Sequence, residues 1–155
     1  MKRSQPYLPE QIFLAVVACL AVAGLWNTYL GPAAQPTAHH HLHAATIFAW
    51  LVLLACQLRL VATGNFQSHR KLGLGIVLMG PLMVASAALL SVHSAQEGLA
   101  SGRGDFLIVQ NVMNTLQLAL LIWLAFVFKA RRKLHGYFLL ATGVQFFGIA
   151  LFFTL

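Results

Sequence analysis

The segment His43–Ala62, HAATIFAWLVLLACQLRLVA, decides the fold of this 155-residue chain. It contains one basic residue, Arg59, and no acidic residue. About twenty predominantly apolar residues in a helix are long enough to cross the hydrocarbon core of a bilayer, which is about 30 Å thick. We therefore expect this segment to be a transmembrane helix. Other segments of similar length and low polarity are expected to span the bilayer as well.

The composition of the whole chain favours a lipid environment. Hydrophobic residues make up 59% of the chain and charged residues 8%, whereas a soluble domain carries about 25% charged residues. So few charges cannot cover a soluble surface, and lipid is the expected solvent. The net charge of +7 does not indicate a nucleic-acid partner, because Lys and Arg stand in short runs between apolar segments.

Five apolar segments are long enough to span the bilayer. The sequence therefore predicts an all-α fold, a polytopic transmembrane helix bundle with one integral membrane domain over residues 1–155. Four helices would form the core, and the first would be an additional N-terminal helix retained as a signal anchor. The expected helices cover about residues 11–30, 43–62, 72–92, 106–128 and 134–155.

Basic residues mark one side of the expected bundle. Nine of the ten Lys and Arg residues lie before the first span or around the connections after the second and fourth spans. Only Arg103 lies in the other set of connections, within the expected outer loop Ser94–Asp105. The positive-inside rule then places the N-terminus in the cytoplasm and the C-terminus outside.

A histidine cluster stands at the outer end of the second span: His39, His40, His41 and His43. Imidazole nitrogens suit copper and zinc, so His39–His43 is a candidate metal site. Adjacent loop residues supply two or three ligands more readily than a full tetrahedral set. We expect His39, His40 and His41 to form a flexible, solvated loop, and His43 to enter the helix.

Three further histidines extend this arrangement to two layers. His93 ends the third span at the outer depth of His43, and His69 and His135 open the third and fifth spans at the inner depth. Two facing histidines can ligate a haem iron from both sides. The pairs His43–His93 and His69–His135 are therefore candidate ligands for haem b. Interfacial or helix-capping roles explain the same positions, and both interpretations stay open.

Amide side chains form a polar stripe on the fourth span. Gln110, Asn114 and Gln117 stand at i, i+4 and i+7, which places them on one helix face. That face is expected to avoid lipid. A hydrogen bond between Gln117 and Gln145 near the midplane would satisfy it. The alternative is a polar cavity that holds a cofactor edge or a quinone headgroup.

The second span carries a similar stripe. His43, Trp50 and Gln57 are seven residues apart, so they share a face that drifts slowly around the helix. We expect this face to point into the bundle. Gln57 then becomes a candidate second partner for a cofactor held by the histidines.

The run from His43 through Trp50 and Gln57 to Ser68-His69-Arg70-Lys71-Leu72-Gly73 resembles uncharacterised bacterial multi-pass membrane proteins. These have a His at the start of one helix, a Gln late in it, and H-R-x-x-G opening the next. The resemblance covers about residues 38–155 and implies a bacterial inner-membrane location. More distantly, the arrangement is similar to cytochrome b561 and ferric-reductase-like membrane cytochromes. That resemblance implies b-type haems on histidine pairs, although the ligands of such cytochromes lie inside the helices.

Three functions fit these patterns. The first is a haem-b protein that transfers electrons between a quinone or redox partner protein and an outer acceptor. The second is a copper- or zinc-handling protein that uses the outer histidine cluster. The third is a non-catalytic scaffold or assembly subunit, working as a homo-oligomer or in a membrane complex. No Ser/His/Asp set, phosphate loop or CxxC motif is present, so an enzyme here would be a membrane oxidoreductase.

Overall fold

The computed structural model describes residues 7–32, 34–102 and 104–154, and every regular element within them is helical. The all-α prediction is thus confirmed. A short π-helix, η1, follows the first α-helix without a break in the chain direction. The elements are α1 Leu8–Gly24, η1 Trp26–Leu30, α2 Ala38–Ala62, α3 Phe66–Ser101, α4 Gly104–Val127 and α5 Arg132–Thr154.

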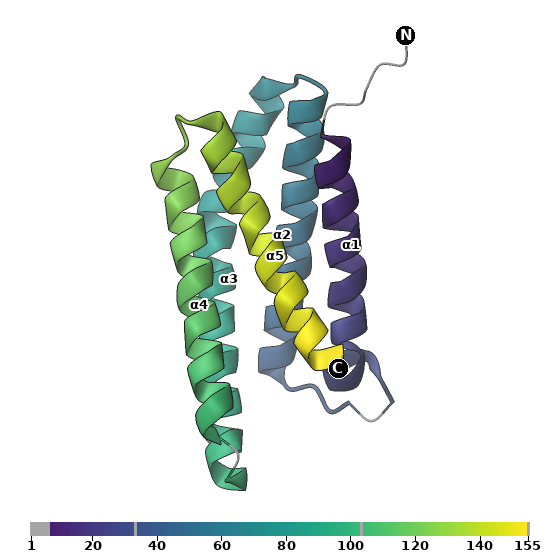
Figure 1. Ribbon diagram of the computed structural model, residues 1–155, viewed down its shortest axis with the longest axis vertical. Helices are drawn as coiled ribbons and strands as arrows, with labels where there is room; N and C mark the ends of the chain where they lie inside the picture. Colours follow the sequence, from purple (N-terminus) through teal and green to yellow (C-terminus); the bar gives the residue numbers. More distant parts are fainter. Residues whose placement is uncertain (1–6, 33, 103, 155) are drawn as a thin grey trace.

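The five α-helices form an up-and-down bundle. Each helix packs against the next in chain order, and α5 returns to pack against α1 (Figure 1). The N-terminal helix is therefore part of the core and not an addition to a four-helix bundle. Leu14 and Val17 of α1 are buried with Leu51 of α2 and Leu139 of α5 in one hydrophobic cluster.

The two ends of the bundle differ in charge. The α2–α3 and α4–α5 connections lie at the end where α1 begins, and the guanidinium of Arg132 lies 5.7 Å from the ring centre of Phe66 across this end. We call it the basic end. Lys2, Arg3 and Arg103 lie outside the described residues. The Lys and Arg residues within the described ranges all belong to the basic end: Arg59, Arg70, Lys71, Lys129, Arg131, Arg132 and Lys133.

The lateral surface of the bundle is apolar. Three helices are long and apolar enough to cross a membrane: α2, residues 66–100 of α3 and residues 108–127 of α4. On α3, Leu74 and Leu78 are 72% and 73% exposed, and on α4 Trp123 is 60% exposed. Exposed apolar side chains of this size are typical of helices that face lipid. The protein is therefore a membrane protein, as its composition predicted.

The second helix begins five residues earlier than expected. α2 starts at Ala38, because Thr37 caps it and His40 closes the capping box from the third helical position. The backbone N–H of Thr37 donates to Nδ1 of His40 over 3.2 Å. Glu or Gln usually takes this place. His39, His40 and His41 are therefore helical, so the expected loop is wrong, although His39 and His41 are exposed.

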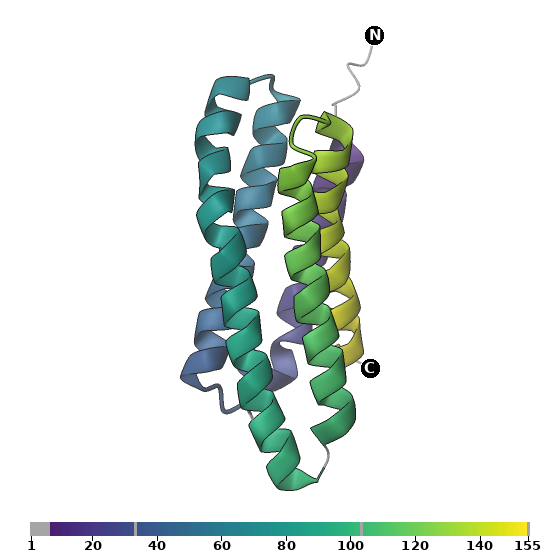
Figure 2. The same cartoon turned by 90° about the vertical axis from the view of Figure 1, so that its left-hand side faces the viewer.

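The third helix is longer than expected at both ends. Its N-cap is Asn65, whose Oδ1 accepts from the N–H of Ser68 over 3.1 Å. At the other end α3 continues to Ser101 and stops at Gly102, which has a left-handed φ of 70°. Most of the expected outer loop Ser94–Asp105 is therefore helix, and the α3–α4 hairpin extends beyond the other helices (Figure 2).

The centre of the bundle combines close packing with one buried hydrogen bond. Trp50 of α2 is fully buried, and its Nε1 donates to Oγ1 of Thr142 on α5 over 3.0 Å. Beside it, α3 and α4 approach closely at Gly80. A Cβ at Gly80 would lie 2.9 Å from Cγ2 of Ile122, so only glycine permits this packing.

We expect Gly80→Ala to lower the stability of the bundle by about 1–3 kcal/mol, because the added methyl group overpacks the α3–α4 contact. Thermal unfolding in mild detergent, followed by circular dichroism, measures this effect. Gly136→Ala is the matched control, since a Cβ at Gly136 meets nothing within 4 Å. Equal melting temperatures for the two variants would contradict the close approach.

Candidate functional site

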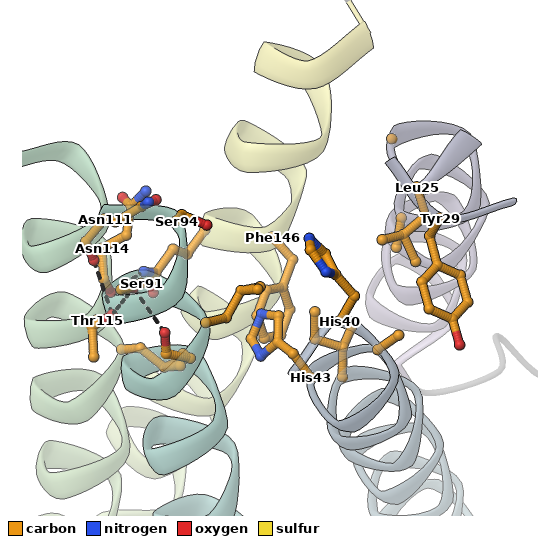
Figure 3. A pocket seen from close by; sticks show the side chains of 18 of the residues that line it. Leu25, Tyr29, His40, His43, Ser91, Ser94, Asn111, Asn114, Thr115 and Phe146 are labelled. Atoms are coloured by element: carbon orange, nitrogen blue, oxygen red, sulfur yellow. Dashed lines mark hydrogen bonds between the residues drawn. The ribbon is translucent and has the colours of Figure 1, made fainter. Parts of the chain in front are cut away.

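A cavity of about 290 Å³ opens between the helices in the half of the bundle away from the basic end (Figure 3). Apolar side chains such as Ile47, Leu118 and Phe146 form much of its wall. Polar groups from five elements also face it. These are Tyr29 of η1, His40 and His43 of α2, Ser91 and Ser94 of α3, Gln110, Asn111, Asn114 and Thr115 of α4, and Gln145 of α5.

His43 is held in the cavity wall by a hydroxyl network. Its Nδ1 lies 3.1 Å from Oγ of Ser86, and the Ser86 hydroxyl donates to the carbonyl of Met83 over 2.9 Å. Thr46 donates to the carbonyl of His43 over 2.8 Å and touches Ser86 at 2.7 Å. A Ser86 hydroxyl that donates to Met83 accepts from Nδ1–H of His43, which is the tautomer that this network accommodates. In that tautomer the Nε2 atom carries a lone pair.

The opposite wall presents amide oxygens. Nε2 of Gln145 donates to the backbone carbonyl of Asn114, which fixes the orientation of the Gln145 amide. Oε1 of Gln145 and Oε1 of Gln110 are both buried without a hydrogen-bond partner. A buried acceptor without a partner costs about 1–3 kcal/mol, so both atoms favour a ligand that donates hydrogen bonds.

The expected Gln117–Gln145 hydrogen bond is wrong. Gln117 is exposed on the outside of α4 and lines a second cavity between α4 and α5. Gln145 instead reaches Asn114, one helical turn before Gln117. The stripe does form a polar cavity wall, through Gln110 and Asn114, as the alternative interpretation predicted.

The outer histidines point in three directions. His39 stacks on His93 with ring centres 4.6 Å apart, and His40 meets the same ring edge-on at 6.0 Å. Nδ1 of His41 lies 2.7 Å from the hydroxyl of Tyr29. His43 turns into the cavity instead. Within the described residues, no three His, Cys, Asp or Glu side chains gather in a group that could hold a metal ion.

His93 lies apart from the cavity wall that His43 forms. Its Nε2 is 3.3 Å from a carboxylate oxygen of Glu97 and 3.4 Å from Oγ1 of Thr37. The structure thus brings His93 to His39 and His40, and it assigns His43 a different partner, Ser86.

The basic end holds a second polar cluster. Gln57 is 4% exposed, and both atoms of its amide lack a hydrogen-bond partner. Nδ1 of His69 is also buried without a partner, and Nδ1 of His135 lies 2.8 Å from the carbonyl oxygen of Ala125. A Cβ at Gly73, one turn after His69, would lie 3.5 Å from Nε2 of Gln57. Gln57 therefore packs against α3, one turn from His69.

Sequence reasoning missed the residues that orient His43. Ser86 is 2% exposed and Thr46 is 4% exposed, and neither was a predicted site residue. A signal was available, because a serine in the middle of an apolar span needs a partner inside the bundle. The stripe His43, Trp50 and Gln57 was predicted to face inward, and this is confirmed for Trp50 and Gln57 by their burial.

No protein-family model, no curated protein and no solved structure matches this chain.

We expect Ser86→Ala to release the tautomer of His43 and to destabilise the bundle by about 1–2 kcal/mol, because Nδ1–H loses its acceptor. Nitrogen-15 NMR of histidine-labelled protein measures the tautomer. Ser94→Ala is the control, since it alters the same cavity wall and leaves the partner of His43 in place. Unchanged His43 nitrogen shifts in Ser86→Ala would show that the network does not set the tautomer.

Proposed function

We propose that this is an integral membrane protein that binds the headgroup of a lipid-soluble quinol in the cavity between α2, α3, α4 and α5. The observation that supports it is a set of hydrogen-bond acceptors without partners on facing walls. These are Nε2 of His43 on one side and Oε1 of Gln110 and of Gln145 on the other.

The chemistry of a quinol matches this wall. A quinol carries two hydroxyl donors on opposite edges of a flat apolar ring, and the cavity offers acceptors separated by apolar side chains such as Ile47 and Phe146. Small-molecule sites typically combine an apolar lining with a few placed polar groups. A lipid-soluble molecule also reaches a membrane protein through the bilayer, without crossing water.

His43 would accept a hydrogen bond from one hydroxyl of the quinol. With Nδ1–H donated to Ser86, the imidazole would present a lone pair on Nε2. A partner on the second ring nitrogen commonly sets the tautomer of a functional histidine. Gln110 and Gln145 would accept the second hydroxyl and orient the ring, and the apolar wall would exclude water.

Haem b fits this cavity poorly. A haem iron held by two histidines needs one imidazole on each face, but both cavity histidines, His40 and His43, come from α2. The facing wall supplies amides from α4 and α5. The expected ligand pair His43–His93 is not adopted by these side chains, so we derive no step through haem at this site.

For the topology we propose five spans with the basic end in the cytoplasm. α1 has 17 residues and continues into the five residues of η1, and α5 has 23 residues. At about 1.5 Å per residue each reaches the thickness of the hydrocarbon core. The gathering of the described Lys and Arg residues at one end supports this orientation. The quinol cavity then lies in the outer half of the membrane.

We expect the purified protein to bind a short-tailed quinol such as decylubiquinol, measured by anaerobic titration calorimetry in detergent. His43→Phe and Gln110→Leu should each weaken binding by about tenfold, because each removes one hydrogen bond. The oxidised quinone, which has no hydroxyl donors, should also bind at least about tenfold more weakly.

Gln96→Leu is the control for this titration, since Gln96 is an exposed amide on α3. It should leave the affinity for the quinol unchanged. Equal affinities in all three variants, or tighter binding of the quinone than of the quinol, would refute a quinol site in the cavity.

The orientation is tested with single cysteines. In a background with Cys19→Ala and Cys56→Ala, which removes both exposed native thiols, we expect Gln96→Cys to react with a membrane-impermeant maleimide on intact spheroplasts. Asn65→Cys should react only after the membrane is permeabilised. The reverse pattern would place the basic end outside.

A further inference from the structure

A second cavity, of about 370 Å³, lies between α4 and α5 on the lateral surface of the bundle. We call it the lateral groove. Three of its lining residues, Gln110, Asn114 and Gln145, also line the inner cavity that contains His43. These three residues therefore form the wall between the lateral groove and the inner cavity.

The path of α5 opens the lateral groove to the surroundings of the bundle. α5 begins beside α4 at the basic end and crosses to α1 (Figure 1). At the middle of α5, Gly143 lies against α1, where a Cβ would be 3.2 Å from Cε1 of Phe13. The next residue, Val144, lines the groove and is 56% exposed. The groove is thus open on a surface that faces lipid.

Gln117 is a polar residue of the groove that lies on this lipid-facing surface. Its side chain is exposed, and Leu116 and Leu120 beside it are 60% and 51% exposed. It lies ten residues before Val127, the last residue of α4, which is about 15 Å along the helix. This is half the thickness of the hydrocarbon core. An amide at that depth cannot turn to water, so it favours a ligand with hydrogen-bonding groups.

We propose that the lateral groove is the passage by which the quinol headgroup moves from the bilayer into the inner cavity. This inference rests on the proposed function. A headgroup inside the bundle stays attached to its apolar tail, so the inner cavity needs an opening toward lipid. The groove provides Gln117 for the headgroup in transit, and Ala141 and Val144 offer apolar contacts to the tail.

Hydrogen-bond acceptors line this passage along one face of α4. Gln117, Asn114 and Gln110 are three and four residues apart, so consecutive Cβ atoms lie about 5–6 Å apart. Gln117 offers its amide oxygen, and Gln110 offers an Oε1 without a partner. Between them, the backbone carbonyl of Asn114 accepts from Nε2 of Gln145. A quinol hydroxyl would replace that N–H when the Gln145 side chain moves aside, so each step exchanges one hydrogen bond for another.

Binding kinetics of decylubiquinol to the full-length protein in lipid nanodiscs test the passage. Val144→Trp should obstruct the groove and leave the inner cavity intact. Association and dissociation should then both slow by at least about tenfold, with the dissociation constant unchanged, because both use the same route. Gln117→Leu should slow both rates by about threefold, since the headgroup loses one hydrogen bond in transit. A scintillation proximity assay with tritiated quinol measures both rates and the affinity.

Val112→Trp is the matched control, because Val112 is 47% exposed on α4 and lines neither cavity. It should leave both rates unchanged. An unchanged dissociation constant also shows that each variant folds.

The outcomes separate the passage from the quinol site itself. Normal affinity with unchanged rates in Val144→Trp and Gln117→Leu would overturn the passage and leave the quinol site standing. A loss of affinity in Val144→Trp without slower association would place the bound headgroup in the groove, which also contradicts a passage. Absence of quinol binding by the unaltered protein would refute the proposed function, and the passage with it.

Discussion

The whole bundle depends on one constraint, which is that a polar group surrounded by lipid needs a partner within the protein. The hydrogen bond from Trp50 to Thr142 satisfies this constraint at the centre and joins α2 to α5. Gln145 satisfies it with the carbonyl of Asn114 and joins α5 to α4. Between lipid-facing helices the hydrophobic effect is weak, so such pairs and close contacts as at Gly80 decide which faces meet.

The same constraint separates structural from functional polar groups. At the centre, Trp50 and Thr142 have used their hydrogen-bonding capacity, and they are fully buried. Toward the two ends, buried polar atoms remain without partners: the amide oxygens of Gln110 and Gln145 at one end, and the amide of Gln57 at the other. In a bilayer these atoms cannot turn to bulk water, so the two ends are where ligands are expected.

The sequence was sufficient for the features that follow from periodicity and length. The seven-residue spacing of His43, Trp50 and Gln57 predicted the buried face of α2, and the apolar segments predicted an all-helical membrane protein. Helix ends were predicted less well, because His40 occupies a capping position where Glu or Gln is usual. The partner of Gln145 was also missed, since which residues of two helices meet depends on their rotation and depth, and spacing along one helix does not determine these.

The expected pair His43–His93 shows most clearly how the placement of a helix decides which residues meet. The prediction placed His43 at the depth of His93, because the second helix was expected to begin at His43. α2 begins at Ala38 instead, so His43 lies one turn deeper than His39 on the same helix face. His39 and His40 therefore meet His93, while His43 meets Ser86, about two turns before His93 on α3. An error at a helix end thus shifts depth by a turn and changes which residues meet. Nδ1 of His43 contacts the hydroxyl of Ser86, which leaves Nε2 to face the cavity. Ser86 belongs to no sequence motif, yet it orients the histidine that the motif contains.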